Sequence, residues 1–428
     1  MFNFIHHITK FLSDKYKLPL APWGEGARRA GEGLFFALFL SSCTNVASDN
    51  SEAFTGPFLQ YDSLWAHSDS YSEKVEIKYA KGLKVDYRED GIHVFISNPD
   101  PKARNSKTEE VVIPSQTGSL STGEGGGKSD VDNIGICARG HKKFICTTAL
   151  QLGNFEVLGM EERIVGMNSL KNVFSPKIKQ QLAEGKTVRV GKEGNFDLEA
   201  VIASKPDYIF VSASKYGGFE SLKECGIPLI SHHGYRETDP LGQAEWIKLI
   251  GLLTGETRRA NAVFEDIESK YNAIKAKVAT IKAKKKELPT ILSGRQIRDG
   301  WYVMGGKSYM ARIFADAGVD YIMKDIDEAG GTALDFETVY AKGINADYWQ
   351  IDGTFDDEFT LNDLTTEDAR YGDIKAYKNQ HVLFCNFAKT PYRELGGLEP
   401  HRLLSDFVKA FYPEILPNYT PKYYKLMK

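Results

Sequence analysis

The chain has 428 residues, of which 42% are hydrophobic and 26% charged, and its formal net charge is −3 at pH 7. This length allows two domains with additional structure, and a charge so close to zero gives no support for nucleic-acid binding. The sequence contains no Cys-x-x-Cys pair and no Gly-x-x-x-x-Gly-Lys-Ser/Thr loop, so it lacks the signatures of a thiol redox enzyme and of a P-loop nucleotide hydrolase.

Residues 1–43 have the form of a signal peptide that ends in a lipidation site. Arg28 and Arg29 precede a short apolar run, and Leu40-Ser-Ser-Cys43 closes it. The run is too short to span a bilayer as a mature helix. Because Leu-Ser-Ser-Cys is similar to a bacterial lipobox, Cys43 is the predicted lipidated N-terminus, and residues 44–73 are the predicted flexible tether. The alternative is a buried apolar helix with an incidental cysteine.

Residues 74–140 are predicted to form a small antiparallel β appendage and a loop. Three short runs at 75–79, 83–87 and 92–96 alternate between apolar and polar residues, and Asp90-Gly91 separates the last two. Asp-Gly between alternating runs is a hairpin signal. The loop is the stretch 116–130, which is rich in glycine and serine.

Two α/β lobes are predicted at 141–240 and 288–428. In both, β-prone runs such as Phe144–Thr148 and Thr290–Leu292 alternate with short helices, which indicates mainly parallel sheets. Residues 241–287 between them are predicted connecting helices. The longest begins at Thr257 and carries apolar residues at spacings of three and four, without an internal proline or glycine. A stiff connector of this kind predicts a small rocking motion on ligand binding.

One segment occurs twice and relates the two lobes. Residues 198–210 read Leu-Glu-Ala-Val-Ile-Ala-Ser-Lys-Pro-Asp-Tyr-Ile-Phe, and residues 336–349 read Phe-Glu-Thr-Val-Tyr-Ala-Lys-Gly-Ile-Asn-Ala-Asp-Tyr-Trp. In each copy a glutamate, Glu199 or Glu337, opens a short helix that leads through a polar break into an aromatic strand. The repeat predicts two similar lobes whose strand ends face each other across a ligand cleft.

This order of segments resembles the substrate-binding proteins of ABC importers for ferric siderophores, haem or vitamin B12, in their lipoprotein form. The resemblance covers residues 140–428, and Leu198-Glu199 through Asp207-Tyr-Ile is its most specific part. Gly305-Gly-Lys-Ser308 and the second acidic unit follow in the expected order. The second unit departs from the family pattern, because Lys-Gly-Ile-Asn-Ala-Asp replaces Lys-Pro-Asp, and the β appendage lies outside the common core.

The resemblance implies a periplasmic, membrane-anchored receptor without catalytic residues or a cofactor. Such a receptor binds an iron chelate, either a siderophore or haem, between its lobes and delivers it to an ABC permease and ATPase complex. Glu199 and Glu337 would meet arginines on the permease; the alternative for either is a carboxylate favoured by a helix N-terminus. Vitamin B12 or another corrinoid is the alternative ligand. A chelatase-like enzyme on a similar two-lobed fold and a surface haem scavenger without a permease are the alternative functions.

Ligand contacts are expected on loops at the carboxyl ends of the strands. Aromatic and cationic side chains suit a planar or catecholate-rich anion, because rings stack on it and cations pair with its oxygens. The candidates in the first lobe are Thr147, Thr148, Lys215, Tyr216, His233 and Tyr235. The candidates in the second lobe are Arg295, Arg298, Trp301, Tyr302, Lys307, Tyr392 and Arg393. Each of them is alternatively a surface-turn or core residue.

The sequence shows no ligand set for a bare metal ion. His232 and His233 are adjacent, and neighbouring residues of an extended strand point to opposite sides. We therefore predict a metal chelate, with one histidine as an axial ligand to haem iron left open. In an oxidising compartment Cys137 and Cys146 are able to pair, but four buried free thiols, at 137, 146, 225 and 385, are the favoured prediction.

Overall fold

The computed structural model describes residues 59–100, 102, 107–115, 131–135, 141–168, 173–212, 218–355 and 357–428. All of them belong to one compact unit, residues 53–428. The predicted signal peptide, Cys43 and most of the tether lie outside the described residues. The tether prediction is wrong from residue 59 onward, because Leu59–Ala66 form helix α2 and Ser68–Ser70 a 3-10 turn.

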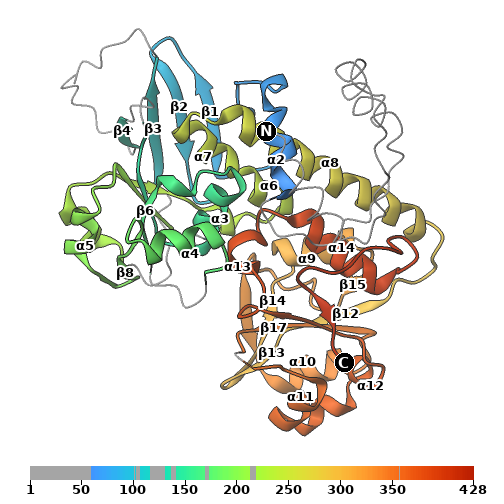
Figure 1. Cartoon of the computed structure of the whole chain (residues 1–428). Helices are drawn as coiled ribbons and strands as arrows, with labels where there is room; N and C mark the ends of the chain where they lie inside the picture. The colour runs from blue at the N-terminus through green and yellow to red at the C-terminus, as the bar shows by residue number, and fades with distance from the viewer. Residues whose placement is uncertain are drawn as a thin grey trace, which may run out of the picture. The chain divides into compact units, whose positions relative to one another are not determined.

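The first lobe, called the N-lobe, is built on a five-stranded sheet in the order β11-β10-β5-β6-β7, with every pairing parallel. Its strands are β5 (Phe144–Cys146), β6 (Ile164–Met167), β7 (Val188–Arg189), β10 (Tyr208–Val211) and β11 (Leu229–Ser231). The helices α3 (Ala149–Val157), α4 (Pro176–Ala183) and α5 (Leu198–Ala203) connect them, with a short β8 (Gly191–Lys192) and β9 (Asn195–Phe196) hairpin before α5. Figure 1 shows this lobe in green.

The second lobe, called the C-lobe, repeats the arrangement with the order β15-β12-β17-β18-β19. The strands are β12 (Thr290–Ser293), β15 (Asp320–Tyr321), β17 (Tyr348–Gly353), β18 (Val382–Asn386) and β19 (Lys425–Leu426), and only β19 pairs antiparallel. A second, antiparallel sheet contains β13 (Arg295–Ile297), β14 (Gly300–Met304) and β16 (Gly331–Leu334). The helices are α9 (Tyr309–Asp316), α10 (Phe336–Gly343), α11 (Leu361–Glu367), α12 (Lys375–Lys378), α13 (Tyr392–Leu395) and α14 (Pro400–Phe411).

The connecting region contains the predicted long helix. Helix α8 spans Thr257–Lys282; on its predicted apolar face Val263, Ile267, Tyr271 and Val278 are buried, and Ile274 and Ile281 are half-buried against the core. Two short helices, α6 (Pro240–Glu245) and α7 (Ile247–Thr254), precede it in the predicted connecting region. Two lobes with mainly parallel sheets, one long connecting helix and a β appendage confirm the predicted fold class (Figure 1). The exact bounds of the predicted domains stay a prediction.

The β appendage is a four-stranded sheet in the order β1-β2-β3-β4. Its strands are β1 (Leu83–Tyr87), β2 (Gly91–Ile96), β3 (Thr108–Pro114) and β4 (Val131–Gly135), and β3 and β4 pair parallel. The predicted hairpin between β1 and β2 is confirmed. The predicted strand at 75–79 is wrong, because a distant carboxylate takes its backbone hydrogen bonds.

That carboxylate belongs to Glu245, at the end of α6, whose side chain is 0% exposed. It accepts hydrogen bonds from the backbone N–H groups of Lys78, Tyr79 and Ala80 at 2.7–3.1 Å. Lys248 Nζ lies 2.9 Å from the same carboxylate and also donates to the Glu76 carbonyl. The segment before the appendage is therefore fixed to the connecting helices by a buried, hydrogen-bonded ion pair.

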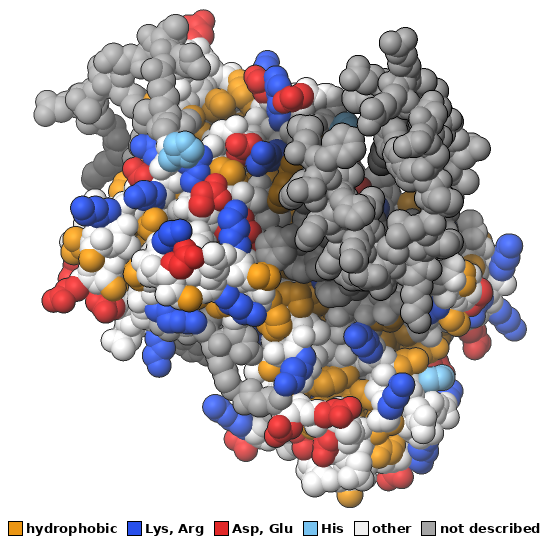
Figure 2. All heavy atoms as spheres, in the orientation of Figure 1, with side chains coloured by type: hydrophobic (Ala, Val, Ile, Leu, Met, Phe, Trp, Pro, Cys, Tyr) orange, Lys and Arg blue, Asp and Glu red, His pale blue; other side chains and the backbone are white. Residues whose placement is uncertain are grey.

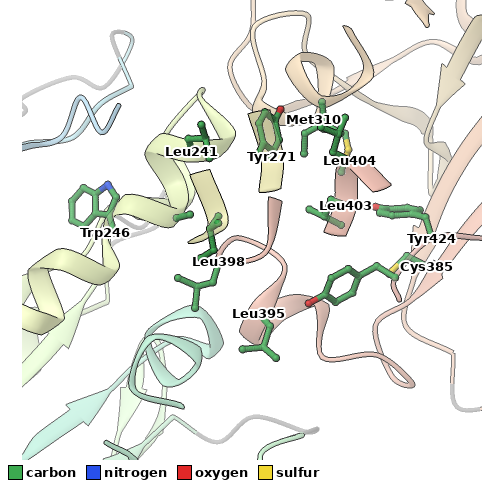
Figure 3. Close-up of a cluster of buried hydrophobic side chains, with 14 of the residues drawn as sticks. Leu241, Trp246, Tyr271, Met310, Cys385, Leu395, Leu398, Leu403, Leu404 and Tyr424 are labelled. Atoms are coloured by element: carbon green, nitrogen blue, oxygen red, sulfur yellow. The ribbon is translucent and has the colours of Figure 1, made fainter. Parts of the chain in front are cut away.

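The same hydrophobic core runs through the appendage, both lobes and the connecting helices. Figure 3 shows part of it, from Leu241 and Trp246 in the connecting region, through Leu395 and Leu398, to Tyr424 in the C-lobe. Cys146 and Cys385 are buried free thiols in this core, as predicted. Cys225 is free but only half-buried, which corrects that prediction for this residue, and Cys137 lies outside the described residues.

The lobes meet where α3 of the N-lobe packs against α13 of the C-lobe. A Cβ atom added at Gly153 would lie 1.9 Å from the Glu394 carbonyl oxygen, so only glycine allows this approach. The buried Glu394 carboxylate accepts a hydrogen bond from the Phe174 backbone N–H at 2.9 Å, which adds a polar contact between the lobes.

We expect Gly153→Ala to lower the free energy of unfolding by about 1–3 kcal/mol, because the added methyl group forces the two helices apart. Urea denaturation measures the change. Gly330→Ala is the matched control, because a Cβ atom there meets nothing within 4 Å. Equal stability of the two variants would show that α3 and α13 have room to move.

Candidate functional site

The main sheet of the C-lobe brings three predicted loops to one edge. Strands β12, β17 and β18 run parallel, with Ser293 opposite Gln350 and Gly353 opposite Asn386. Their carboxyl ends therefore lie side by side, which is where open α/β sheets bind ligands. The residues that follow these ends include Arg295, Thr354, Phe355, Phe387 and Arg393.

Two guanidinium groups lie over aromatic rings at this edge. The Arg295 guanidinium carbon is 5.2 Å from the centre of the Phe355 ring, and that of Arg393 is 5.1 Å from the centre of the Phe387 ring. Arg393 is exposed, and its Nη2 donates to the Thr354 hydroxyl at 3.4 Å. The C-lobe thus places the predicted Arg295 and Arg393 over two rings, Phe355 and Phe387, that were not among the candidates, and this combination suits an anionic, planar ligand.

Tyr392 is half-buried beside this group, and its ring stacks on Phe387 with 4.9 Å between centres. Its hydroxyl forms a hydrogen bond with the Tyr309 hydroxyl. Burial raises the pKa of Tyr392 well above its usual value, and the neighbouring Tyr309 raises it further, so the phenol stays neutral. Tyr392 therefore offers a ring face more readily than a free hydroxyl.

Trp301 does not line this surface. Its side chain is 0% exposed, packs against Phe336 and Tyr371 with 5.4 Å between ring centres, and donates its indole N–H to the Ser293 carbonyl. The prediction that Trp301 stacks on the ligand is wrong. Alternation along β14 explains the error, because neighbouring residues face opposite sides: Trp301 faces the core, whereas Tyr302 is 46% exposed.

Two further C-lobe candidates are surface residues. Arg298 occupies the turn between β13 and β14 with φ +56° and is exposed. Lys307 is exposed and forms an ion pair with Asp327. Near the turn is a cavity of about 320 Å³, lined by Arg295, Gln296, Arg298, Glu367, Asp368, Arg370 and Tyr371. Arg295 donates to Glu367 at 2.8 Å there, so its charge is already paired.

The N-lobe strand ends are held by their own hydrogen bonds. Thr147 is buried and donates its hydroxyl to the Phe210 carbonyl at 2.9 Å, so it is not available to a ligand, contrary to the prediction. The Thr148 hydroxyl caps α3 by accepting from the Gln151 N–H. Gln151 in turn donates to the Ser212 hydroxyl at 3.2 Å. These residues shape the edge of the N-lobe sheet.

The two histidines pack against Trp246, with ring centres 4.9 Å from it for His232 and 6.1 Å for His233. Burial lowers the pKa of His232 to about 3, with a smaller contribution from His233. Burial and Arg236 lower the pKa of His233 to about 4. Both rings are therefore neutral at pH 7. Tyr235 is exposed, with the Arg236 guanidinium 4.9 Å from its ring centre.

Some predictions for the N-lobe fall outside the described residues, namely Lys215 and Tyr216. Within the described ranges, no group of three or more His, Cys, Asp or Glu side chains is placed to hold a metal ion. In the same part of the chain, no helix has both the length and the apolar character needed to cross a membrane.

The repeated unit places its two glutamates equivalently. Asp197 caps α5 by accepting from the Ala200 N–H at 2.9 Å, and Asp335 caps α10 by accepting from the Thr338 N–H at 2.8 Å. Glu199 and Glu337 each occupy the second helical position and are exposed. Their surroundings differ. Glu337 forms an ion pair with Arg370 at 2.9 Å, whereas Glu199 forms none with a described residue.

The sequence prediction missed Gln151, Phe355 and Arg370. Gln151 was detectable, because Thr148-x-x-Gln151 is a capping-box pattern. Phe355 and Arg370 gave no local signal, because their partners lie 60 and 33 residues away in the chain (Arg295 and Glu337). Figure 2 shows Lys and Arg side chains interspersed with Asp and Glu on the face that it draws, so charge alone does not mark a site there.

Comparison with known proteins identifies the family. The family model for periplasmic binding proteins matches residues 145–388. An uncharacterized lipoprotein of Methanocaldococcus jannaschii is 30% identical over 267 residues, which are 60% of this chain and 60% of that protein, so the chain spans less than two thirds of this relative.

Two solved structures share the fold. The periplasmic haem-binding protein of Vibrio cholerae aligns with a TM-score of 0.50 and 15% identity, covering 62% of this chain and 98% of that one. A periplasmic binding protein from Veillonella parvula aligns with a TM-score of 0.50 and 15% identity, covering 64% of this chain and 91% of that one. Since the family model matches more than half of the sequence, the chain belongs to the periplasmic binding protein family.

Proposed function

We propose that this protein is the receptor of an ABC importer, anchored by a lipid at Cys43, that binds an iron chelate and delivers it to a permease and ATPase complex. The observation that carries the proposal is the pair of guanidinium–ring contacts, Arg295 on Phe355 and Arg393 on Phe387, at one edge of the C-lobe sheet. On the scaffold of a periplasmic binding protein, this edge is the expected place for a ligand.

The chemistry of this edge favours an anionic chelate, either a siderophore or haem. The exposed Arg393 presents a delocalised cation that pairs with carboxylate or phenolate oxygens, and the neighbouring rings of Phe387 and Tyr392 suit a planar ligand. Neutral His232 and His233 do not form a cation site with other described side chains. Purification from native cells followed by absorbance and metal analysis distinguishes haem, a ferric siderophore and a corrinoid.

Removal of the Arg393 side chain tests the site. We expect Arg393→Ala and Tyr302→Ala each to weaken binding by about 1–3 kcal/mol, roughly 5- to 150-fold in Kd, if they contact the ligand. Calorimetry with haemin and with a ferric catecholate measures the effect. Lys375→Ala is the control, because Lys375 pairs with Asp347 before the start of β17, at the opposite edge of the sheet. Unchanged affinity in both test variants would place the ligand elsewhere.

The proposed anchor is tested by the mature N-terminus. Mass spectrometry of the protein from native membranes is expected to find a lipid-modified Cys43 as its first residue. A Cys43→Ala variant is expected in the soluble fraction, because it lacks the thiol that receives the lipid. Residues 1–42 on the mature chain would contradict the proposed processing.

A further inference from the structure

We infer that Arg370 is a positioning residue for Glu337. It makes the C-lobe docking point a paired carboxylate and guanidinium, whereas the N-lobe carboxylate, Glu199, has no ion-pair partner among the described residues. The inference rests on the proposed function, in which Glu199 and Glu337 contact the permease. It adds the chemistry of the partner at the C-lobe: an acidic side chain opposite Arg370.

The Arg370 guanidinium is held from three directions. Asp368 accepts from its Nε at 3.0 Å and from its Nη2 at 2.7 Å, and Glu337 accepts from its Nη1 at 2.9 Å. Its central carbon lies 3.5 Å from the centre of the Phe336 ring. A planar group with bidentate and stacking contacts has few other orientations. The Glu337 carboxylate, which is 77% exposed, is thereby held at a defined place on the surface.

This arrangement contributes little to folding, because an exposed ion pair is worth little in water. Its main effect is on recognition, since a carboxylate that is already ordered loses less side-chain entropy when a partner binds. The guanidinium has five N–H groups, of which three serve Asp368 and Glu337 in the contacts described above. The other two are able to donate to an acceptor on the partner.

An acidic side chain of the partner that accepts from Arg370 would enter the cavity of about 320 Å³ that Arg370 lines. Arg298 and Arg370 both line it, together with Tyr371. Glu367 in the same lining is paired with Arg295. Arg298 forms no ion pair with another described residue, so an acidic side chain of the partner in this cavity would meet an unneutralised guanidinium.

The N-lobe docking point lacks these features. Glu199 has no ion pair with a described residue, and Ile202, three positions further along α5, is 57% exposed. The residue three positions after Glu337 is Tyr340, which is half-buried and stacks on Phe336. The two points are thus related in backbone and different in chemistry. A partner that matches one point does not match the other, so the receptor docks in a preferred orientation.

The test measures binding of the purified, ligand-free receptor to an ABC permease and ATPase complex from the same organism, held in nanodiscs. We expect Arg370→Gln to weaken this binding about 10-fold and Arg298→Gln to weaken it less. Arg370→Lys is expected to be intermediate, because it keeps the charge and loses the bidentate contact. Arg312→Gln on α9 is the control, an exposed arginine whose ion-pair partner among the described residues is Asp316 in its own helix.

Melting temperature and binding of haemin or a ferric catecholate are expected to stay unchanged in both Arg370 variants and in Arg312→Gln, which separates positioning from a structural role. If the wild-type receptor binds the complex and Arg370→Gln binds it with the same affinity, the inference is overturned. The proposed function would then still stand. Failure of the wild-type receptor to bind the complex would overturn the proposed function.

Discussion

Replacing both Glu199 and Glu337 by lysine is expected to abolish stimulation of the transporter ATPase by the receptor. In the proposed docking, each substitution would turn an attraction to a permease arginine into a repulsion, and like charges brought together at an interface cost several kcal/mol. Two such sites together are expected to lower the docking affinity more than 100-fold. The free energy of unfolding is expected to change little, because both carboxylates are exposed.

ATP hydrolysis by the reconstituted complex, with haemin or a ferric catecholate bound to the receptor, measures this effect. A double variant with lysine at Glu162 and Glu414 makes the same change in net charge at two other exposed positions, and it is expected to stimulate normally. Ligand affinity is measured in parallel. If the Glu199 and Glu337 variant lost ligand binding, these residues would belong to the ligand site and the docking role would be wrong.

Glu245→Ala is expected to lower the free energy of unfolding by about 3–5 kcal/mol. The substitution removes the acceptor for the N–H groups of Lys78, Tyr79 and Ala80, and it leaves Lys248 as a buried ammonium group without its carboxylate. Breaking one half of a buried ion pair is among the most destabilising single changes, because the other charge stays in a region of low polarity.

Chemical denaturation measures this loss, and Glu162→Ala, at a half-exposed carboxylate, is the control with an expected change below about 1 kcal/mol. Adding Lys248→Met to Glu245→Ala is expected to recover part of the stability, since it removes the uncompensated charge. A loss below about 1 kcal/mol in Glu245→Ala would show that water reaches the site and replaces the carboxylate.

Elements with a strong local signal were predictable from the sequence. The apolar face of α8 and the two copies of the acidic unit depend on spacing along the chain, and both are confirmed. The strand predicted at 75–79 failed because its hydrogen bonds go to Glu245, more than 160 residues away. No periodic pattern near that strand carries information about such a distant acceptor.

The candidate site was predictable only to the level of its loops. The carboxyl ends of β17 and β18 carry Phe355 and Phe387; Arg393 follows Phe387 closely after the same strand, whereas the Arg295 that lies over Phe355 comes from the end of β12. From the sequence, Trp301 and Tyr302 had equal standing as ligand contacts. Alternation along a strand shows that neighbouring residues face opposite sides of the sheet, but it does not show which side faces the core. Burial on folding decided between them.

The contacts of Glu399 bear on the order in which the chain folds. Its buried carboxylate accepts hydrogen bonds from the Tyr61 hydroxyl near the start of the described unit and from Lys422 and Tyr423 near its end. Near the same end of the chain, strand β19 pairs with β18 at the edge of the C-lobe sheet. Contacts between segments more than 300 residues apart form late and slowly. A chain under synthesis therefore reaches its final packing only after the segment 419–427 has left the ribosome.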